Sequence, residues 1–241
     1  PKNLSVEDIL IRSSNIGTLT LAQKIGEKDY RKFIKDTNLL NTPKFELEEL
    51  GTPLNFNWHK CKLETISYGH GIAITPLQAA ATYGALVNGG KIIKPTIIKT
   101  NEYKLNKQII SSETSKKLNI ILRKVVTEKE GTASLANVYG YNVGGKTGTS
   151  QQYEKKNENL NTFISVFPSN KPKYTLLVML ENPKIAKELI YNYRGLKIKG
   201  TRNEAGWNSV YTAGKIIKKI GPILAIKNEE FYDNYVAEKL N

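Results

Sequence analysis

Residues 140–150 constrain the fold of this chain more than any other stretch, because they fit two motifs that need different backbones. They read Gly-Tyr-Asn-Val-Gly-Gly-Lys-Thr-Gly-Thr-Ser. Gly140, Gly145, Lys146 and Thr147 match G-x-x-x-x-G-K-[ST], a phosphate-binding loop in which a helix begins at the Lys-Thr pair. The same letters contain Lys-Thr-Gly, a motif of serine acyl-transfer enzymes that needs an open edge strand along which a peptide can lie. The neighbouring residues decide between the two.

Residues on both sides of this stretch favour the strand. Thr132–Tyr139 is not a convincing buried strand ahead of a phosphate loop, and Gly148 stands where the helix of that loop would begin. Ser150–Asn161 lacks the apolar periodicity of a helix. Leu176–Leu180 followed by Glu181 does imitate a strand that ends in a metal-binding acid, so a nucleotide hydrolase is kept as a third hypothesis.

The size and charge of the chain limit its fold and its partners only loosely. Its 241 residues are 39% hydrophobic, enough for one substantial core or two small ones. A net charge of +14 would suit a nucleic acid or an anionic membrane. However, the densest lysines, Lys155-Lys156 and Lys215, Lys218 and Lys219, are not interleaved with aromatic residues as a base-stacking surface requires. We therefore interpret the charge as a solvated basic face.

The cysteine and histidine counts exclude an internal disulfide and disfavour a zinc site. The chain has one cysteine, Cys61, and two histidines, His59 and His70. Residues 65–90 lack charged side chains, but their proline and glycines indicate a loop and a buried helix rather than a membrane span. No signal peptide is visible, and because the chain begins with Pro1 we expect a fragment of a longer protein.

Helical signals dominate the first half of the chain and strand signals follow. Caps and apolar spacing predict helices after Ser5 and Asp8, and then at Asn15–Ile25, Asp29–Lys35, Thr75-Pro76 to Gly89-Gly90, Glu113–Val126 and Gly206–Ile220. Strands are predicted at Asn142–Thr149, Thr162–Phe167 and Tyr174–Leu180, and Lys91–Lys99 is rich in β-formers. The almost continuously apolar third strand is expected to be central and buried on both faces. Polar loops favour antiparallel pairing, so the fold class is α+β.

Two short motifs precede the Lys-Thr-Gly stretch. Ser13-Ser14-Asn15 puts a hydroxyl and an amide two positions apart at the start of a helix, which by itself indicates a helix cap. Tyr68-Gly69-His70-Gly71 lies just before the Thr75-Pro76 helix start and by itself indicates a turn. Neither motif specifies a function alone.

Together, the order, spacing and flanks of these motifs resemble penicillin-binding proteins, in particular class B transpeptidases of the cell-division type. The resemblance covers nearly the whole chain and rests on Ser13–Gly17, Ser67–Gln78, Glu130–Ala133, Gly144–Thr149 and Ala205–Asn208. It implies an α+β fold of the penicillin-binding-protein/β-lactamase type, an antiparallel sheet flanked by helices, with its N-terminal part missing. Residues 1–225 would be a partial transpeptidase domain and residues 226–241 a C-terminal tail.

The resemblance implies a peptidoglycan D,D-transpeptidase that cross-links stem peptides by serine acyl transfer and is trapped by penicillin. Ser13 would relay protons, Asn15 would hydrogen-bond the peptide group of the substrate, and Lys146 would supply positive potential. The substrate-binding residues would be Tyr68, Gly69, Thr147, Gly148 and Thr149, the last also giving its backbone N–H to an oxyanion hole. No metal or organic cofactor is implied. A β-lactamase or a β-lactam sensor of the same fold is the alternative.

The nucleophile motif of the family, Ser-x-x-Lys, is absent, because no serine in the sequence has a lysine three positions on. Only 12 residues precede Ser13. We therefore expect the motif upstream of Pro1, and we expect this chain alone to form no acyl-enzyme. Without the missing strands of the family, Tyr174–Leu180 would leave an apolar edge open, so we also expect poor solubility of the chain alone.

The resemblance also suggests where the longer protein works. It implies septal cell-wall synthesis on the periplasmic side of the bacterial inner membrane, with anchoring by an N-terminal helix absent from this chain. The ligands would be D-Ala-D-Ala stem peptides and β-lactams, and no nucleic acid is expected. Division-complex membrane proteins would be partners, but no residue of the sequence identifies the surface that they contact.

Overall fold

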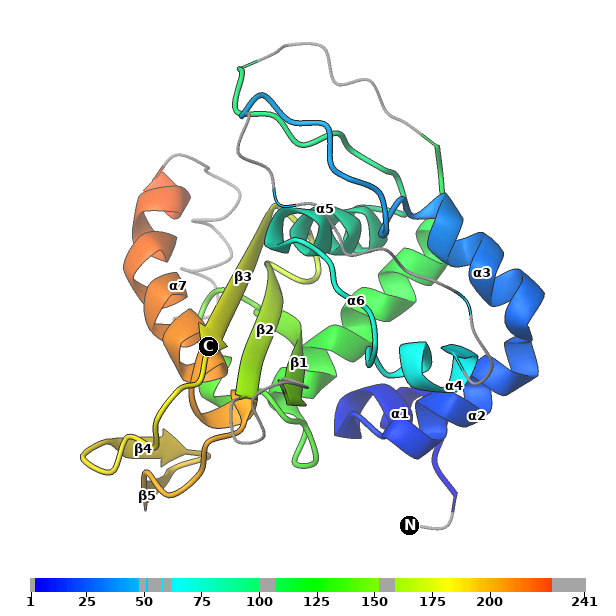
Figure 1. Ribbon diagram of the computed structural model, residues 1–241. Coiled ribbons are helices and arrows are strands. Elements are labelled where there is room, and N and C mark those ends of the chain that lie inside the picture. Colours follow the sequence, from blue (N-terminus) through cyan, green and yellow to red (C-terminus); the bar gives the residue numbers. More distant parts are fainter. Residues whose placement is uncertain are drawn as a thin grey trace. The chain divides into compact units, whose positions relative to one another are not determined.

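The computed structural model describes residues 3–47, 51, 58, 62–99, 107–151 and 159–226, which form two compact units (Figure 1). Unit 1 ends at Leu118 and unit 2 begins at Asn119, so the boundary falls within one helix, α6 (Ser112–Thr127). The expected tail, apart from residue 226 at the end of the last helix, lies outside the described residues, as do Cys61 and His59.

The described part of unit 1 is mainly helical. Before α6 its helices are α1 (Val6–Arg12), α2 (Asn15–Ile25), α3 (Glu27–Asp36), α4 (Lys62–Ser67) and α5 (Pro76–Val87). The predicted starts of α1 and α5 are confirmed. Ser5 and Asp8 form a reciprocal capping box before α1. The Thr75 hydroxyl accepts a hydrogen bond from the Gln78 N–H at 3.1 Å, and Pro76 is the first residue of α5.

Close helix packing sets the position of the Ser13–Gly17 motif. α2 packs on α1, α3 and α4. A Cβ at Gly17 would lie 2.5 Å from Cγ1 of Ile9, which is buried in the core of unit 1. Only glycine at position 17 therefore lets α2 approach α1 this closely, and the turn between the two helices carries Ser13.

The segment Lys91–Lys99, which is rich in β-formers, forms almost no regular strand. Lys91 forms an isolated antiparallel bridge with Gln108, and the Ile92 N–H donates to the Lys107 carbonyl at 3.2 Å. The rest of the segment has no strand within the residues that the structure describes. β-propensity measures how a side chain fits a sheet and does not supply the partner strand. The short helix α4 was not predicted.

Unit 2 combines an antiparallel sheet with the last helix. Its elements after α6 are η1 (Ser134–Ala136), β1 (Gly144–Gln151), β2 (Asn159–Phe167), β3 (Tyr174–Glu181), β4 (Ile190–Tyr193), β5 (Leu196–Lys199), η2 (Ala205–Trp207) and α7 (Ser209–Ile226). The larger sheet has the order β1-β2-β3, and α7 packs on β2 and β3 (Figure 1). The three predicted strands, their antiparallel pairing and the α+β fold are confirmed.

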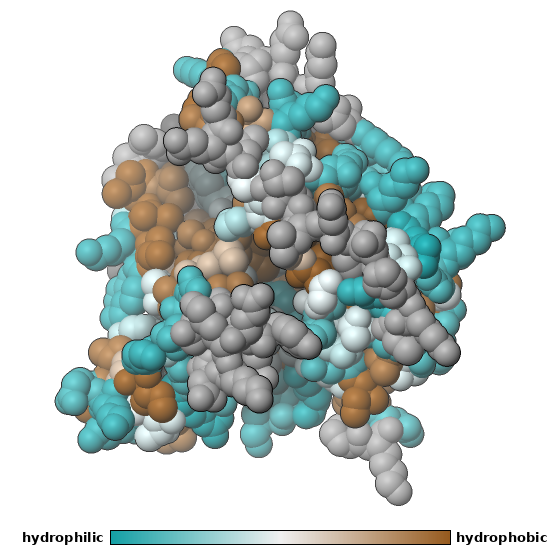
Figure 2. Space-filling view, viewed as in Figure 1, coloured by the Kyte–Doolittle hydropathy of each residue, from teal (hydrophilic) through white to brown (hydrophobic). Residues whose placement is uncertain are grey.

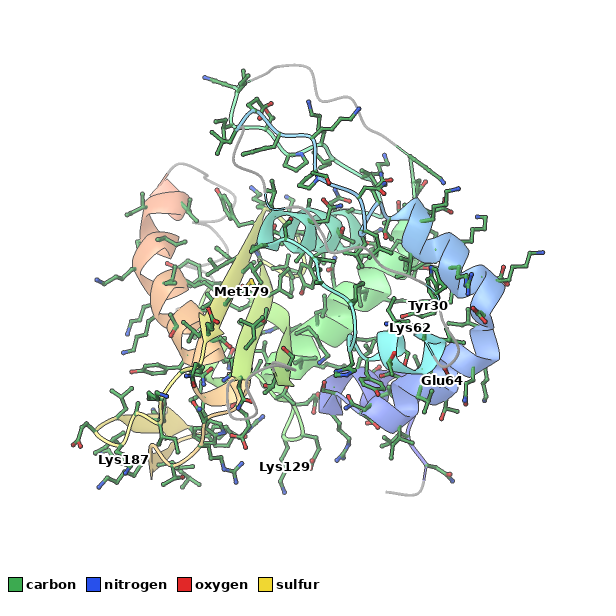
Figure 3. All side chains as sticks on the ribbon, viewed as in Figure 1. Tyr30, Lys62, Glu64, Lys129, Met179 and Lys187 are labelled. Atoms are coloured by element: carbon green, nitrogen blue, oxygen red, sulfur yellow. The ribbon has the colours of Figure 1, made fainter. Side chains whose placement is uncertain are left out.

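Tyr174–Leu180 (β3) lies at an edge of the described sheet, because β2 lies between β1 and β3. This agrees with the open apolar edge expected for a chain without the missing strands, whereas the expected burial on both faces is not observed. β2 buries Phe163 and Val166 completely, whereas on β3 only Val178 is buried and Met179 is 36% exposed (Figure 3). Hydrophobic residues gather at the surface near α7 and β3 (Figure 2). A continuous run of apolar residues predicts that a strand is buried, but it does not give the order of the strands in the sheet.

A second, two-stranded sheet was not predicted. β4 and β5 are joined by Arg194 and Gly195, both with left-handed backbones (φ 53° and 83°) as a two-residue hairpin turn requires. Tyr191 and Tyr193 on β4 pack against Trp207, with ring centroids 5.5 and 5.1 Å away. The sequence signal was the alternation of apolar and polar residues on both sides of a turn with glycine, aromatic before it and aliphatic after it.

Neither a membrane-spanning helix nor a metal-binding cluster is found among the described residues. None of the helices there is long and apolar enough to cross a membrane. The same part of the chain has no cluster of three or more His, Cys, Asp or Glu side chains that could hold a metal ion.

Candidate active site

Ser13 and Ser14 have different structural roles, although they are adjacent in sequence. Ser13 ends α1 with a left-handed backbone (φ 55°, ψ 50°), which is uncommon for a residue other than glycine. Ser14 caps α2, because its hydroxyl accepts a hydrogen bond from the Gly17 N–H at 3.1 Å. Ser13 and Asn15 are exposed. The N-cap interpretation therefore applies to Ser14, whereas Ser13 is the C-cap of α1 and Asn15 is the first residue of α2.

We expect Ser14→Ala to lower the free energy of unfolding by about 1 kcal/mol, because the N–H of Gly17 loses its acceptor. Ser14→Asp is the matched control, since aspartate caps helices as well as serine does, and it should keep the stability of the wild type. Urea denaturation of the protein as its gene encodes it would measure both. Equal losses in the two variants would show that Ser14 does not act as a cap.

Tyr68 and Gly69 lie in the turn that follows α4. Tyr68 is 41% exposed and its ring stacks against that of His70, with centroids 6.4 Å apart. The N–H of His70 donates to the Thr65 carbonyl at 3.0 Å, which ends the helix. A Cβ at Gly69 would meet no described atom within 4 Å, but the backbone there is left-handed (φ 87°), so glycine is favoured by conformation rather than by space. The turn is confirmed, and the substrate-binding role stays a prediction.

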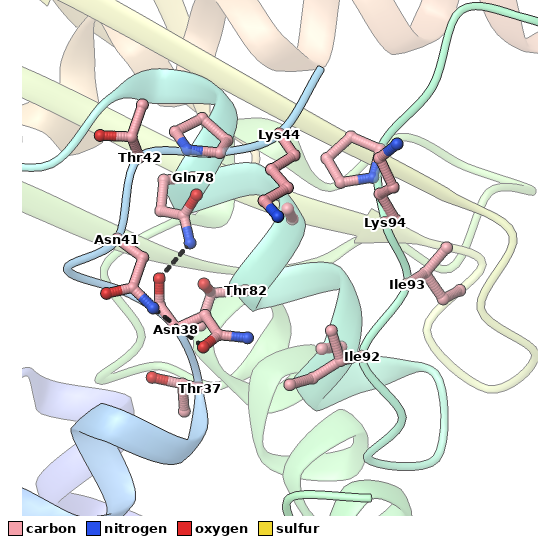
Figure 4. A pocket seen from close by; sticks show the side chains of 14 residues that line it. Thr37, Asn38, Asn41, Thr42, Lys44, Gln78, Thr82, Ile92, Ile93 and Lys94 are labelled. Atoms are coloured by element: carbon pink, nitrogen blue, oxygen red, sulfur yellow. Dashed lines mark hydrogen bonds between the residues drawn. The ribbon is translucent and has the colours of Figure 1, made fainter. Parts of the chain in front are cut away.

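Gln78, the last residue of the Ser67–Gln78 segment, has a structural role in unit 1. It is 6% exposed, and its side-chain amide donates to the Asn38 carbonyl, while Asn41 Nδ2 donates to Asn38 Oδ1 at 3.0 Å (Figure 4). These residues line a cavity of about 360 Å³ between the turn after α3, helix α5 and residues 92–95. None of the site residues proposed from the sequence lines this cavity.

The Lys-Thr-Gly motif lies on β1, an edge strand of the described sheet. Lys146 pairs with Ile164 and Thr147 pairs with Phe163, both in regular antiparallel register. No helix begins at residues 146–147, as a phosphate-binding loop would require. The nucleotide-hydrolase hypothesis is therefore wrong, and the edge strand that acyl transfer needs is present.

The side chain of Lys146 is half-buried, and its ammonium donates to the Thr147 carbonyl at 2.9 Å. Burial lowers the pKa of Lys146 to about 8, because a charged ammonium is less well solvated there than in water. At neutral pH the group is thus mostly protonated but close to titration. It can supply positive charge, or exchange a proton more readily than an ordinary lysine can.

The two threonine hydroxyls of β1 are both held by other parts of unit 2. Oγ1 of Thr147 lies 2.8 Å from Oγ1 of Thr132, in the loop after α6. Oγ1 of Thr149 accepts a hydrogen bond from the Ala205 N–H at 3.2 Å. Because an amide N–H can only donate, this bond leaves the proton of Thr149 available for an anionic ligand. Residues 147 and 149 are two positions apart on the strand, so their side chains point to the same face of the sheet.

Packing requires glycine at two positions of β1, Gly144 and Gly145, but not at Gly148. A Cβ at Gly144 would lie 3.0 Å from the Ser169 Cβ, and one at Gly145 would lie 2.5 Å from Cζ of Phe163. At Gly148 the nearest described atom would be the Thr162 Cβ, at an ordinary 3.8 Å. The described fold therefore leaves space above Gly148, where a substrate could approach the strand.

An α+β unit with Lys-Thr-Gly on an open edge strand is the arrangement that acyl-transfer enzymes of this kind require. Residues 1–201 match the family model of the penicillin binding protein transpeptidase domain, so the chain belongs to that family. The fold is accordingly of the penicillin-binding-protein/β-lactamase type, as expected from the sequence.

The relatives and solved structures similar to this chain agree with that assignment. It is 30% identical to the probable peptidoglycan D,D-transpeptidase FtsI of Caulobacter vibrioides, over 94% of this chain and 39% of that protein. It is 32% identical to stage V sporulation protein D of Bacillus subtilis, over 73% of this chain and 30% of that protein. Penicillin-binding protein 3 of Mycobacterium tuberculosis, complexed with ampicillin, has the same fold (TM-score 0.71, 24% identity, 90% of this chain and 51% of that one). The chain thus spans less than half the length of these two curated relatives.

Proposed function

We propose that this chain carries the second and third active-site motifs of a class B peptidoglycan D,D-transpeptidase, which cross-links stem peptides by serine acyl transfer. The observation that carries the proposal is the Lys146-Thr147-Gly148-Thr149 sequence on an edge strand, with a half-buried ammonium and space above Gly148. Relatives named as peptidoglycan D,D-transpeptidases support it. Penicillin-binding protein 3 of Mycobacterium tuberculosis, solved in complex with ampicillin and with aztreonam, supports β-lactams as ligands.

Each motif has a role that its chemistry allows. Ser13 relays a proton, since a hydroxyl both donates and accepts, and Asn15 hydrogen-bonds the peptide group of the substrate. Lys146 supplies positive potential next to the reacting centre. The hydroxyls of Thr147 and Thr149 donate to the substrate carboxylate. The backbone N–H of Thr149 stabilises the oxyanion, Gly148 gives the substrate room, and Tyr68 and Gly69 bind it from the turn after α4.

The nucleophile does not come from a Ser-x-x-Lys motif of these 241 residues, because the sequence has none. A polypeptide of this sequence alone is therefore inactive. The longer protein works in septal cell-wall synthesis, outside the inner membrane and held there by an N-terminal helix, with division-complex proteins as partners. The Ala205–Asn208 segment, similar to cell-division members of the family, supports the septal role.

A labelled penicillin tests this function. The protein as its gene encodes it should gain the mass of one penicillin, and the ester should persist for minutes or longer. The 241-residue chain alone should gain none. An adduct on the chain alone would overturn the proposed source of the nucleophile. Rapid loss of the ester with hydrolysed penicillin in solution would favour the alternative, a β-lactamase.

The Thr132 hydroxyl positions Thr147, so its loss should weaken ligand binding more than it slows chemistry. We expect Thr132→Val, which keeps the shape of the side chain, to raise the penicillin concentration for half-maximal acylation rate about tenfold, with a smaller change in the maximal rate. Thr132→Ser keeps the hydroxyl and should behave like the wild type. Stopped-flow acylation kinetics would separate the two parameters, and a loss of maximal rate alone would contradict the positioning role.

A further inference from the structure

A groove of about 430 Å³ lies on unit 2, away from the residues assigned above. One wall is η1 with the turn after it, which includes Tyr139 and Tyr141, and the other wall is the face of α7 that carries Tyr211, Lys215 and Lys218. In the sequence, aromatic residues are not interleaved with these lysines. In the folded protein, however, three tyrosines line the same groove as Lys215 and Lys218.

Glycines in α7 bring the two walls together. A Cβ at Gly214 would lie 2.7 Å from the Leu135 carbonyl oxygen, and a Cβ at Gly221 would overlap the ring of Tyr141. Both glycines are buried. The α7 backbone therefore packs directly against the Leu135 carbonyl and the Tyr141 ring, which fixes how close the two walls lie.

The lining of the groove is aromatic and basic. Tyr139 is 54% exposed, and Nζ of Lys215 lies 5.2 Å from the centre of the Tyr211 ring. Lys215 and Lys218 are exposed, and among the residues that the structure describes no acidic side chain lines the groove. Pro222 has no N–H, so the carbonyl of Lys218 lacks its usual helical donor at that position. The groove thus offers two positive charges and an aromatic surface.

We propose that this groove docks an acidic, aromatic peptide segment of a partner protein. Tyrosines provide contact area at low entropic cost and are common at the centres of protein interfaces. Two lysines without a lining carboxylate favour a segment with at least two acidic residues, by charge complementarity. The net charge of +14 would steer such a segment toward the chain. This assigns a contact surface for partners that the sequence alone does not identify.

Two other occupants fit the groove less well. A nucleic acid is held by neutralising many phosphates, and the groove supplies only two lysines. A lipid surface is broad and nearly flat, whereas the tyrosines line a concavity. The chain itself also has an acidic and aromatic stretch, Glu229 to Asp233, which reads Glu-Glu-Phe-Tyr-Asp. The experiment must distinguish these occupants from a partner segment.

Selection of random twelve-residue peptides displayed on phage against the protein as its gene encodes it would test the proposal. We expect enriched peptides to combine at least two carboxylates with an aromatic residue. Fluorescence anisotropy should show binding of the best peptide at least tenfold weaker to Lys215→Glu/Lys218→Glu than to the wild type. Lys219→Glu is the matched control, because this exposed lysine is on the same helix but does not line the groove, and it should bind like the wild type.

Several outcomes would overturn the proposal. The first is a selection that enriches no peptide, and the second is one that enriches neutral or basic peptides. The third is a best peptide that binds the Lys215→Glu/Lys218→Glu variant as tightly as it binds the wild type. Groove-dependent binding of phosphatidylglycerol vesicles or of oligothymidine, tighter than that of the best peptide, would assign the groove to a membrane or a nucleic acid. A variant ending at Ile226 that binds the peptide at least tenfold more tightly would identify residues 227–241 as the occupant. Penicillin acylation should be unchanged in all charge variants, so this test is independent of the proposed function.

Discussion

Lys146→Met is expected to slow acylation by a labelled penicillin by a factor of about 10² to 10⁴, in the protein as its gene encodes it. The substitution keeps most of the aliphatic side chain and removes the ammonium that we place beside the reacting centre. Lys187→Met is the control, because Lys187 is exposed and on the surface of the same unit (Figure 3), and it should change the rate less than twofold. A similar rate in wild type and Lys146→Met would remove this lysine from the mechanism.

The lowered pKa of Lys146 gives this prediction a pH dependence. If the positive charge is what acts, acylation should be fast below pH 8 and should fall as the pH rises through about 8, where the ammonium loses its proton. Lys146→Arg stays charged, so it should remove this alkaline limb while keeping most of the rate at pH 7. An inactive arginine variant would show instead that residue 146 must itself exchange a proton.

The same burial affects stability with a definite sign. The folded protein binds the Lys146 proton less tightly than the unfolded chain does, so the free energy of unfolding rises with pH between about 8 and 10.5. Below pH 8 the ammonium is charged in both states, and the full cost of burying its charge lowers the stability of the fold. Lys146→Met should therefore raise the thermal midpoint at pH 7, by an amount equivalent to about 1–2 kcal/mol, and should give no gain above pH 10.5. A residue that lowers stability but speeds the reaction is typical of active sites.

Gly148→Val is expected to slow acylation about 100-fold or more without loss of stability. The added side chain would fill the space above β1 that we assign to the substrate, and the nearest described atom is 3.8 Å from the new Cβ. Valine also favours a strand more than glycine does. The rate would be measured with labelled penicillin and the stability by thermal unfolding.

Gly145→Ala is the matched comparison on the same strand. Its Cβ would lie 2.5 Å from Cζ of Phe163 and 2.7 Å from the Ile164 carbonyl oxygen, so it should lower stability by about 1–3 kcal/mol. The two substitutions are thus expected to have different effects. Gly148→Val should lower the acylation rate, and Gly145→Ala should lower the stability of the fold. A Gly148→Val protein that unfolds as readily as Gly145→Ala would show that Gly148 is needed for packing.

Much of the fold could be predicted because local rules coincide with it. The Ser5–Asp8 capping box, the Thr75-Pro76 start of α5 and the apolar stripe of α6 depend on neighbours within one or two turns. The errors concern long-range pairing. Lys91–Lys99 has the composition of a strand and only one described bridge, and β3 is more apolar than expected for its place at the edge of the described sheet.

Only part of the candidate site could be predicted from the sequence. The position of Lys146 on an edge strand followed from the motif and its polar neighbours. The separation of Ser13 from the capping Ser14 did not, because it depends on one left-handed backbone. The hydroxyl of Thr132 next to Thr147 was also missed as a contact, since 15 residues separate the two in sequence.

The central claim is that Lys146 and Thr149 of β1 serve one acyl-transfer site. A double-mutant cycle on the acylation rate tests it most directly, with Thr149→Val, Lys146→Met and the double variant in the protein as its gene encodes it. Residues that act on the same bound substrate are not independent, so the double variant should be little slower than the slower single variant. Rates that fall by the product of the two single effects would contradict a shared site.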